Sequence, residues 1–328
     1  MKAQIKGITM VFMAALLLSA ASCKKETKEE TEYEGGFTAK AEAQQNDSKV
    51  YLVGTGLEWN ATESIKVFNY GGTGQKFTSY KVYINEANFK PDFEGGEEPE
   101  NFDETFYVEG GYTAYYPCPS SSSETKDGSC YLTLPATQTY TVCDNHPTFD
   151  RNAFLMAGKT KTTAADDRFI YFKNICGLLE LSLYTEETNR YVKSITLKSN
   201  KSDEKLWGTG TVDVSNFDDA SKPALGTLDG GGSTLTLDCS SYNNGQGVTL
   251  GTSESSPTVF YFVVPANTLG SGFTVKVETE YGSWTKATSV SNLIVRNQIK
   301  QMPPQKVVIT PSSTFGTSNF GGGPWGGN

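Results

Sequence analysis

Apolar and polar residues alternate in short runs over most of the chain. Residues 179–184 alternate leucine with Glu, Ser and Tyr, and residues 273–278 alternate Phe or Val with Thr, Lys and Glu. Residues 234–238 show the same period of two. This period places one face of a strand in a core and the other in water. Residues 260–264 are apolar throughout and predict a strand buried on both faces.

Turn-forming pairs separate these runs, and the resulting pattern predicts an all-β chain built from β-sandwiches. A polar stretch without alternation, residues 160–168, lies near the middle of the chain. It predicts a linker between a first sandwich over residues 37–159 and a second over residues 169–310. The turn signals are Gly71-Gly72, Asp127-Gly128, Gly230-Gly231-Gly232, Asn244-Gly245 and Tyr281-Gly282.

The first 22 residues form a different pattern, with two lysines, an apolar run over residues 8–18 and then small residues. This pattern predicts a secretory signal peptide, because a membrane-spanning helix needs about 20 apolar residues. The small residues before Cys23 resemble a bacterial lipobox. Cleavage between Ser22 and Cys23 would leave a lipid, with acyl chains such as palmitate, on Cys23. The alternative is an ordinary cleavage site at which Cys23 is incidental, since Ala20 stands where Leu is commonest.

The residues after Cys23 are strongly charged, and residues 23–36 are predicted to be a disordered tether between the lipid and the folded chain. Removal of residues 1–22 takes away two of the 28 basic residues and none of the 37 acidic ones, which leaves a net charge of −11. Such a surface repels phosphate backbones, so no nucleic-acid partner is expected.

Cysteine and carboxylate spacing predicts no metal site and no cofactor. No Cys-x-x-Cys pair occurs. Cys118 and Cys130 flank a serine-rich loop, and they either form a disulfide or are small buried residues. The acidic segment of residues 89–104 is interpreted as a solvated loop rather than a calcium site, because it lacks regular ligand spacing.

Motifs of catalysis are weak in this chain. The single histidine, His146, stands beside a proline, and no Gly-x-Ser-x-Gly sequence accompanies it. The glycine-rich stretch of residues 71–76 lacks the Gly-Lys-Ser/Thr ending of a phosphate loop. We therefore expect no catalytic residues, and the chain is not predicted to be an enzyme.

Eight segments, taken in order, resemble the motifs of fimbrillin-like proteins of Bacteroidetes. Each segment is weakly specific alone, whereas the ordered set over residues 37–309 is fairly specific. The segments are Leu57-Glu58-Trp59-Asn60-Ala61 with Ile65-Lys66-Val67-Phe68, Tyr112-Thr113-Ala114-Tyr115-Tyr116-Pro117, Leu134-Pro135-Ala136-Thr137-Gln138, Phe154-Leu155-Met156-Ala157-Gly158, Phe172-Lys173-Asn174-Ile175-Cys176-Gly177-Leu178-Leu179, Val192–Asn200 with Leu206-Trp207-Gly208, Val263-Val264-Pro265, and Val295-Arg296-Asn297-Gln298-Ile299.

The resemblance implies two tandem transthyretin-like Greek-key β-sandwiches, carried on a lipoprotein of the outer membrane and cell surface. It also implies a structural or adhesive role in fimbriae, as stalk, anchor or tip, with assembly by β-strand donation. In many fimbrillins, a first strand is removed by proteolysis and a strand of a neighbouring subunit replaces it. Here the exchanged strand would be Gly36–Val53, in which Phe37, Ala39 and Ala41 alternate with polar residues. The donated strand would lie around residues 306–310 or beyond. The expected partners are other fimbrial subunits or further copies, a host protein or glycan, and the outer membrane through the lipid.

Two features depart from the family pattern. The first arginine is Arg151, so cleavage after an arginine has no site near the predicted first strand. The tail, residues 311–328, is rich in glycine and carries Phe315, Phe320 and Trp325, which predicts a flexible tail or an aromatic peptide captured by a partner. The alternative function is a non-polymerising, glycan-binding surface lipoprotein, with Trp284 or Trp325 stacking on sugar rings.

Overall fold

The structure is a computed structural model, and its described residues form strands, two short helical turns and connecting loops. The residues that it describes are 37–41, 64–69, 78–85, 88–91, 110–117, 130–143, 145–164 and 166–311.

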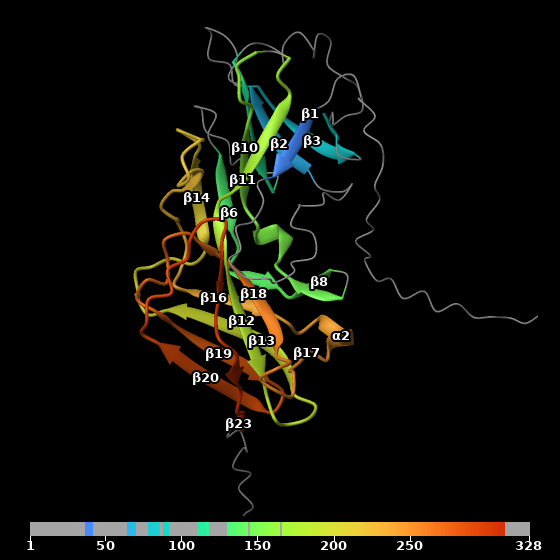
Figure 1. The fold of residues 1–328 in the computed structure, drawn as a ribbon, viewed down its shortest axis with the longest axis vertical. Coiled ribbons are helices and arrows are strands. Elements are labelled where there is room, and N and C mark those ends of the chain that lie inside the picture. Colours follow the sequence, from blue (N-terminus) through green and yellow to red (C-terminus); the bar gives the residue numbers. More distant parts are fainter. Residues whose placement is uncertain are drawn as a thin grey trace, which may run out of the picture.

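One end of the molecule is formed by a curved sheet, called here the N-terminal sheet (Figure 1). Its order is β1-β11-β10-β5-β2-β3-β4, and β4 also pairs with β1, so that the paired strands form a closed ring. The β1–β11 pair is parallel, whereas the other described pairs of this sheet are antiparallel. The strands are β1 (Phe37–Ala41), β2 (Ser64–Asn69), β3 (Thr78–Asn85), β4 (Asn88–Pro91), β5 (Tyr112–Tyr116), β10 (Met156–Lys159) and β11 (Phe169–Asn174).

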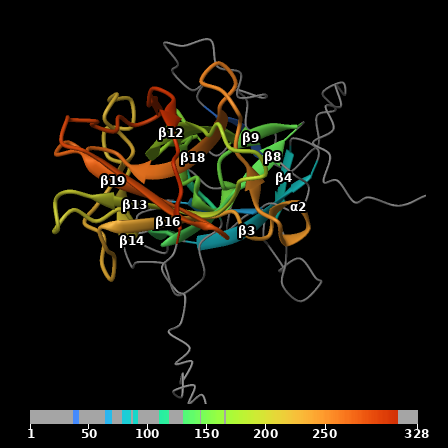
Figure 2. The ribbon, with the colours of Figure 1, turned by 90° about the horizontal axis from the view of Figure 1, so that it is seen from below.

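Two further sheets lie at the other end and pack against each other as a sandwich (Figures 1 and 2). One has the order β18-β12-β21 with β22 also paired to β12, and the other has the order β23-β20-β19-β13-β16-β7 with β17 paired to β13. The strands are β12 (Cys176–Tyr184), β18 (Thr258–Pro265), β21 (Ile299–Gln301), β22 (Gln305–Lys306), β23 (Thr310–Pro311), β20 (Gly282–Thr288), β19 (Phe273–Thr279), β13 (Tyr191–Ser199), β16 (Thr234–Asp238), β7 (Thr137–Thr139) and β17 (Val248–Thr249).

Smaller elements connect the two ends. A three-stranded sheet has the order β15-β14-β6, and β8 and β9 form a hairpin. No helix among the described residues is long and apolar enough to cross a membrane. These elements are β6 (Tyr131–Leu134), β14 (Gly208–Asp213), β15 (Ala224–Leu225), β8 (Thr141–Cys143), β9 (His146–Thr148), the 3-10 turn η2 (Arg151–Ala153) and the short helix α2 (Tyr242–Gly245).

The strand pattern predicted from the sequence is confirmed over most of this region. Residues 273–279 and 234–238 alternate between buried and more exposed positions, and residues 260–264 are buried throughout. The all-β sandwich prediction is therefore confirmed. The half-exposed strand predicted at residues 179–184 is wrong, because Glu180 is buried as well as the leucines. Its carboxylate accepts hydrogen bonds from Tyr261 Oη at 3.1 Å and from Gln301 Nε2 at 3.2 Å.

Buried side chains form two clusters, called here the first core, under the N-terminal sheet, and the second core, between the two sheets of the sandwich. Strand β12 contributes to both, because Leu178 belongs to the first core and Leu179 belongs to the second. The largest fully buried side chains of the first core include the aromatic residues Phe68, Tyr112, Tyr115 and Phe172.

The segment predicted to be a linker, residues 160–168, is bonded to the start of β5. Gly110 N donates to Thr163 O at 2.8 Å, and Thr160 N donates to Tyr112 O at 3.1 Å. Strands on both sides of this segment contribute to each end of the molecule. Strand β7 pairs with β16 in the sandwich, and β11 pairs with β10 in the N-terminal sheet. The division into domains 37–159 and 169–310 stays a prediction.

Candidate strand-exchange site

The residues predicted to form the exchanged strand, Phe37, Ala39 and Ala41, lie in β1 (Figure 1). Strand β1 runs parallel to β11, and its register extends from Thr38 opposite Phe169 to Ala41 opposite Phe172. On its other side it has two antiparallel residue pairs with β4. The edge of β11 that β1 occupies is called the exchange slot.

The two faces of β11 differ. Ile170 and Phe172 are buried in the first core, whereas Phe169 and Tyr171 are half-buried on the opposite face. The rings of Phe169 and Tyr171 lie 4.5 Å apart between centroids, and Lys161 Nζ lies 4.3 Å from the centre of the Tyr171 ring. Core packing on one face and aromatic contact on the other hold β11 in place as the wall of the slot.

A glycine in β10 leaves space for the side chains on the buried face of β11. Gly158 stands opposite Phe172 in the β10–β11 register. A Cβ atom at Gly158 would lie 2.5 Å from Ile170 Cγ2 and 3.0 Å from Phe172 Cδ1. No larger residue fits there without moving the buried side chains of β11.

The chain enters β11 through a turn held by the Asp167 carboxylate. Asp167 Oδ2 accepts hydrogen bonds from Thr162 N at 2.8 Å and Thr162 Oγ1 at 2.7 Å, and Oδ1 accepts from Phe169 N at 3.3 Å. Partial burial alone would raise the pKa of this carboxyl group. The hydrogen bonds together outweigh burial and lower the pKa below its ordinary value.

Backbone groups of successive residues in a strand point to opposite edges. Ile175 N donates to Leu155 O at 2.9 Å, so the odd-numbered residues at this end of β11 face β10. Asn174 O therefore faces the other edge, the one that carries β1. It accepts a hydrogen bond from Arg296 Nη1 at 2.8 Å.

The same edge continues along β12 and is filled by a later part of the chain. Cys176 O accepts from Asn297 N at 3.0 Å, and Leu178 N donates to Gln298 O at 2.9 Å. Further along, Met302 N donates to Glu180 O, and Val307 N donates to Tyr184 O. One edge of the run from residue 169 to residue 184 is thus shared by β1, the Arg296 guanidinium and residues 297–307.

Two sequence segments singled out above meet at this point. A Cβ atom on Gly177 would lie 2.4 Å from Val295 O, so glycine permits the later segment to cross β12 closely. The Asn174 side chain donates to the Asn297 side chain. The resemblance marked both segments, but nothing in the sequence indicated that Arg296 lies beside the predicted exchanged strand.

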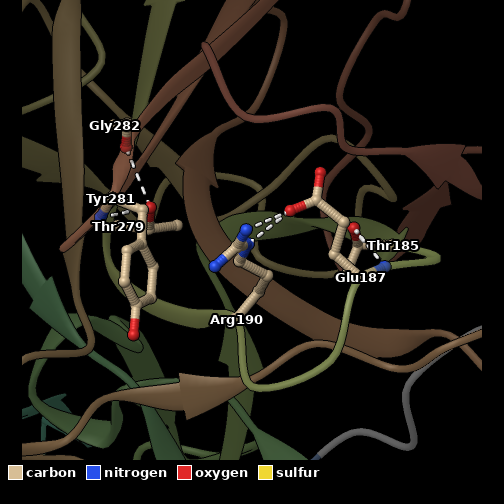
Figure 3. Close-up of polar contacts among 6 residues, drawn as sticks. All are labelled: Thr185, Glu187, Arg190, Thr279, Tyr281 and Gly282. Atoms are coloured by element: carbon tan, nitrogen blue, oxygen red, sulfur yellow. Dashed lines mark hydrogen bonds and ion pairs between the residues drawn. The ribbon is translucent and has the colours of Figure 1, made fainter. Parts of the chain in front are cut away.

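The segment predicted to be donated lies at the far end of the molecule, paired with its own chain. Residues 305–306 form β22 on β12, and Thr310 in β23 pairs with Ser283 in β20. Close to the start of β20, the guanidinium of Arg190 lies between the Glu187 carboxylate and the ring of Tyr281, 4.4 Å from the ring centre (Figure 3). The predicted donor segment and the slot therefore lie at opposite ends (Figure 1).

Several predicted residues lie outside the described part of the chain. Ser22 and Cys23 are among them, so cleavage and lipid attachment stay predictions. Cys118 also lies outside, whereas Cys130 is buried in the first core, and their pairing stays a prediction. The acidic residues 92–104 and the tail beyond residue 311 are likewise outside.

Two other candidate residues are described. Trp284 is partly buried and packs against the second core, whereas its alternative Trp325 lies outside the described residues. His146 is exposed in β9. Among the residues that the structure describes, no group of three or more His, Cys, Asp or Glu could hold a metal ion.

Comparison with known proteins gives a likeness of fold. No family model and no curated protein matches the sequence. A crystal structure of a candidate cell adhesion protein from Bacteroides ovatus matches with a TM-score of 0.51 and 10% identity, over 84% of this chain and 95% of that chain. Another from Bacteroides uniformis matches with a TM-score of 0.42 and 13% identity, over 80% and 90%. The first likeness shows a shared fold, the one expected from the resemblance to fimbrillin-like proteins.

Proposed function

We propose that this chain is a structural or adhesive component of fimbriae, serving as stalk, anchor or tip, and that it assembles by donation of a β-strand into the exchange slot. The observation that carries the proposal is the parallel pairing of β1 with β11. A strand held mainly by main-chain hydrogen bonds can be replaced by another strand that makes the same bonds. Pockets between alternate side chains would then select the incoming strand.

The structural neighbours support this class of function. Those from Bacteroides ovatus and Bacteroides uniformis are described as candidate cell adhesion proteins, and neither is described as an enzyme. Their roles agree with the prediction that this chain acts through binding and assembly at the cell surface rather than through catalysis.

The lipid and the exchanged strand belong to one short segment in this proposal. Cys23 precedes Phe37 by fourteen residues. A cut between β1 and β2 would therefore remove the lipid together with the strand. A polymerising stalk would lose both, and an outer-membrane anchor subunit would keep both. Because Arg151 is the first arginine, such a cut would have to follow another residue, for example Lys49.

The test compares cell-surface material from bacteria that express the wild type or Cys23→Ala. Gels run with and without heating show multimers, and mass spectrometry shows the N-terminal residue of each form. We expect heat-sensitive multimers whose subunits begin between residues 42 and 63, and we expect Cys23→Ala to abolish them. A wild type found only as a full-length, lipidated monomer would contradict a polymerising stalk.

A further inference from the structure

We propose that Arg296 ends the exchange slot and thereby fixes the length and the register of the strand that the slot accepts. This inference rests on the proposed function, strand donation into the slot. Its starting point is the position of the Arg296 guanidinium, which follows directly after β1 on the same edge of β11.

The pairing geometry shows where an incoming strand meets Arg296. In the register of β1, position 40 lies opposite Tyr171, so its N–H and C=O groups face the backbone of Ile170 and Phe172. Position 42 would likewise bond with Phe172 and Asn174. The next donor, the N–H group of position 44, would need Asn174 O, which already accepts from Arg296 Nη1.

Arg296 is held in this position from several sides. Its Nε donates to Ala220 O at 3.0 Å, in a loop on a separate part of the chain. The neighbouring Asn297 bonds to Cys176 O through its backbone and to Asn174 through its side chain. A guanidinium with a rigid, forked geometry that bridges two carbonyl groups is not readily displaced by one strand N–H group.

The chain beyond Arg296 closes the rest of the edge. Residues 297–307 already supply the hydrogen bonds of Cys176, Leu178, Glu180 and Tyr184. Past Asn174, an incoming strand therefore meets an edge whose backbone groups already bond with residues 297–307. The slot fits a short alternating segment that turns away from the sheet, and a shift of register by two residues would bring the strand against the guanidinium.

The experiment uses the full chain, folded intact, with residues 43–48 replaced by the recognition sequence of a specific protease. Cutting the folded protein leaves β1 bound without a covalent link to β2. Two labelled peptides then compete for the slot, one with the sequence of residues 34–42 and one with that of residues 34–45. Fluorescence anisotropy gives the affinity of each peptide for the wild type and for Arg296→Met. The matched control is Arg190→Met, the same change at the opposite end of the molecule.

In the wild type and in Arg190→Met, we expect the longer peptide to gain less than about two-fold in affinity. In Arg296→Met, Asn174 O loses the hydrogen bond from Arg296, and we expect a gain of about five-fold from the hydrogen bond that the N–H group of position 44 then donates to it. Equal length dependence in all three proteins would overturn the role of Arg296 while leaving strand exchange intact. Failure of both peptides to replace β1 in every protein would instead contradict the proposed function.

A second measurement keeps Arg296 in place, so its result does not depend on whether the Arg296→Met variant folds. Hydrogen exchange of the longer peptide, bound to the nicked wild type, reports which of its amides are bonded. We expect protection to end at the position equivalent to residue 42. Protection of the amide at the position equivalent to residue 44 would overturn the inference.

Discussion

The side-chain amide of Gln138 bonds with the backbone of Val263 as a neighbouring strand would. Gln138 Nε2 donates to Val263 O at 2.8 Å, and Gln138 Oε1 accepts from Val263 N at 2.9 Å. Both residues are fully buried and lie 125 positions apart. Since Gln138 belongs to β7 and Val263 to β18, one side chain joins the two sheets of the sandwich.

Replacement of this amide should therefore be costly. Gln138→Met keeps the length of the side chain but leaves a buried N–H and a buried C=O of Val263 without partners. We expect the free energy of unfolding to fall by about 3 kcal/mol, measured by urea denaturation. The matched control is Gln305→Met, because the Gln305 side chain makes only exposed hydrogen bonds. That variant should change by less than about 0.5 kcal/mol, and equal losses in the two variants would contradict the role of Gln138.

The slot wall depends on Gly158. In Gly158→Ala the new Cβ would press on Ile170 and Phe172, and we expect a loss of about 1–3 kcal/mol in the free energy of unfolding. Hydrogen exchange at the amides of β11 should also become faster. Gly270→Ala is the control, because a Cβ there would meet only Leu293 Cδ1 at 3.6 Å. An unchanged stability of Gly158→Ala would show that β11 can shift to accept a larger residue.

The turn into β11 should weaken in acid. The pKa of Asp167 is lowered in the folded protein from its ordinary value of 3.8, so its stabilisation is present above that value and is lost as pH falls through the folded-state pKa. The difference in free energy of unfolding between the wild type and Asp167→Asn should be constant near neutral pH and should shrink below pH 3.8. A difference that stays constant through the acid range would show that the carboxylate charge does not hold this turn.

The Arg190 cluster at the far end should contribute little to stability. Its ion pair with Glu187 is partly exposed to solvent, because the exposed fraction is 24% for the Arg190 side chain and 42% for the Glu187 side chain. Its contact with Tyr281 is also at the surface. We expect Arg190→Met to change the free energy of unfolding by less than about 1 kcal/mol by urea denaturation. A larger loss would mean that the cluster also supports the packing of β23.

Local patterns predicted more of this fold than of its site. The alternation at residues 273–279 is a pattern of adjacent residues, so the sequence alone predicted strand β19. The burial of Glu180 was missed because its partners, Tyr261 and Gln301, are 81 and 121 residues away. The same holds for the slot. The composition of residues 37–41 predicted a strand, but its parallel pairing with β11 and its proximity to Arg296 depend on contacts that no local pattern records.

The most direct test of strand exchange locks β1 in place. Lys40 and Tyr171 stand opposite each other in the β1–β11 register, so Lys40→Cys with Tyr171→Cys allows a disulfide across the slot. Surface material from cells that express this variant is compared on unheated gels with and without a reductant, and Lys40→Cys alone is the control. We predict that the oxidised variant stays monomeric, and that reduction restores heat-sensitive multimers at the level of the control. Multimers that are equally abundant while the disulfide is intact would contradict the claim that β1 leaves its slot to admit the strand of another copy.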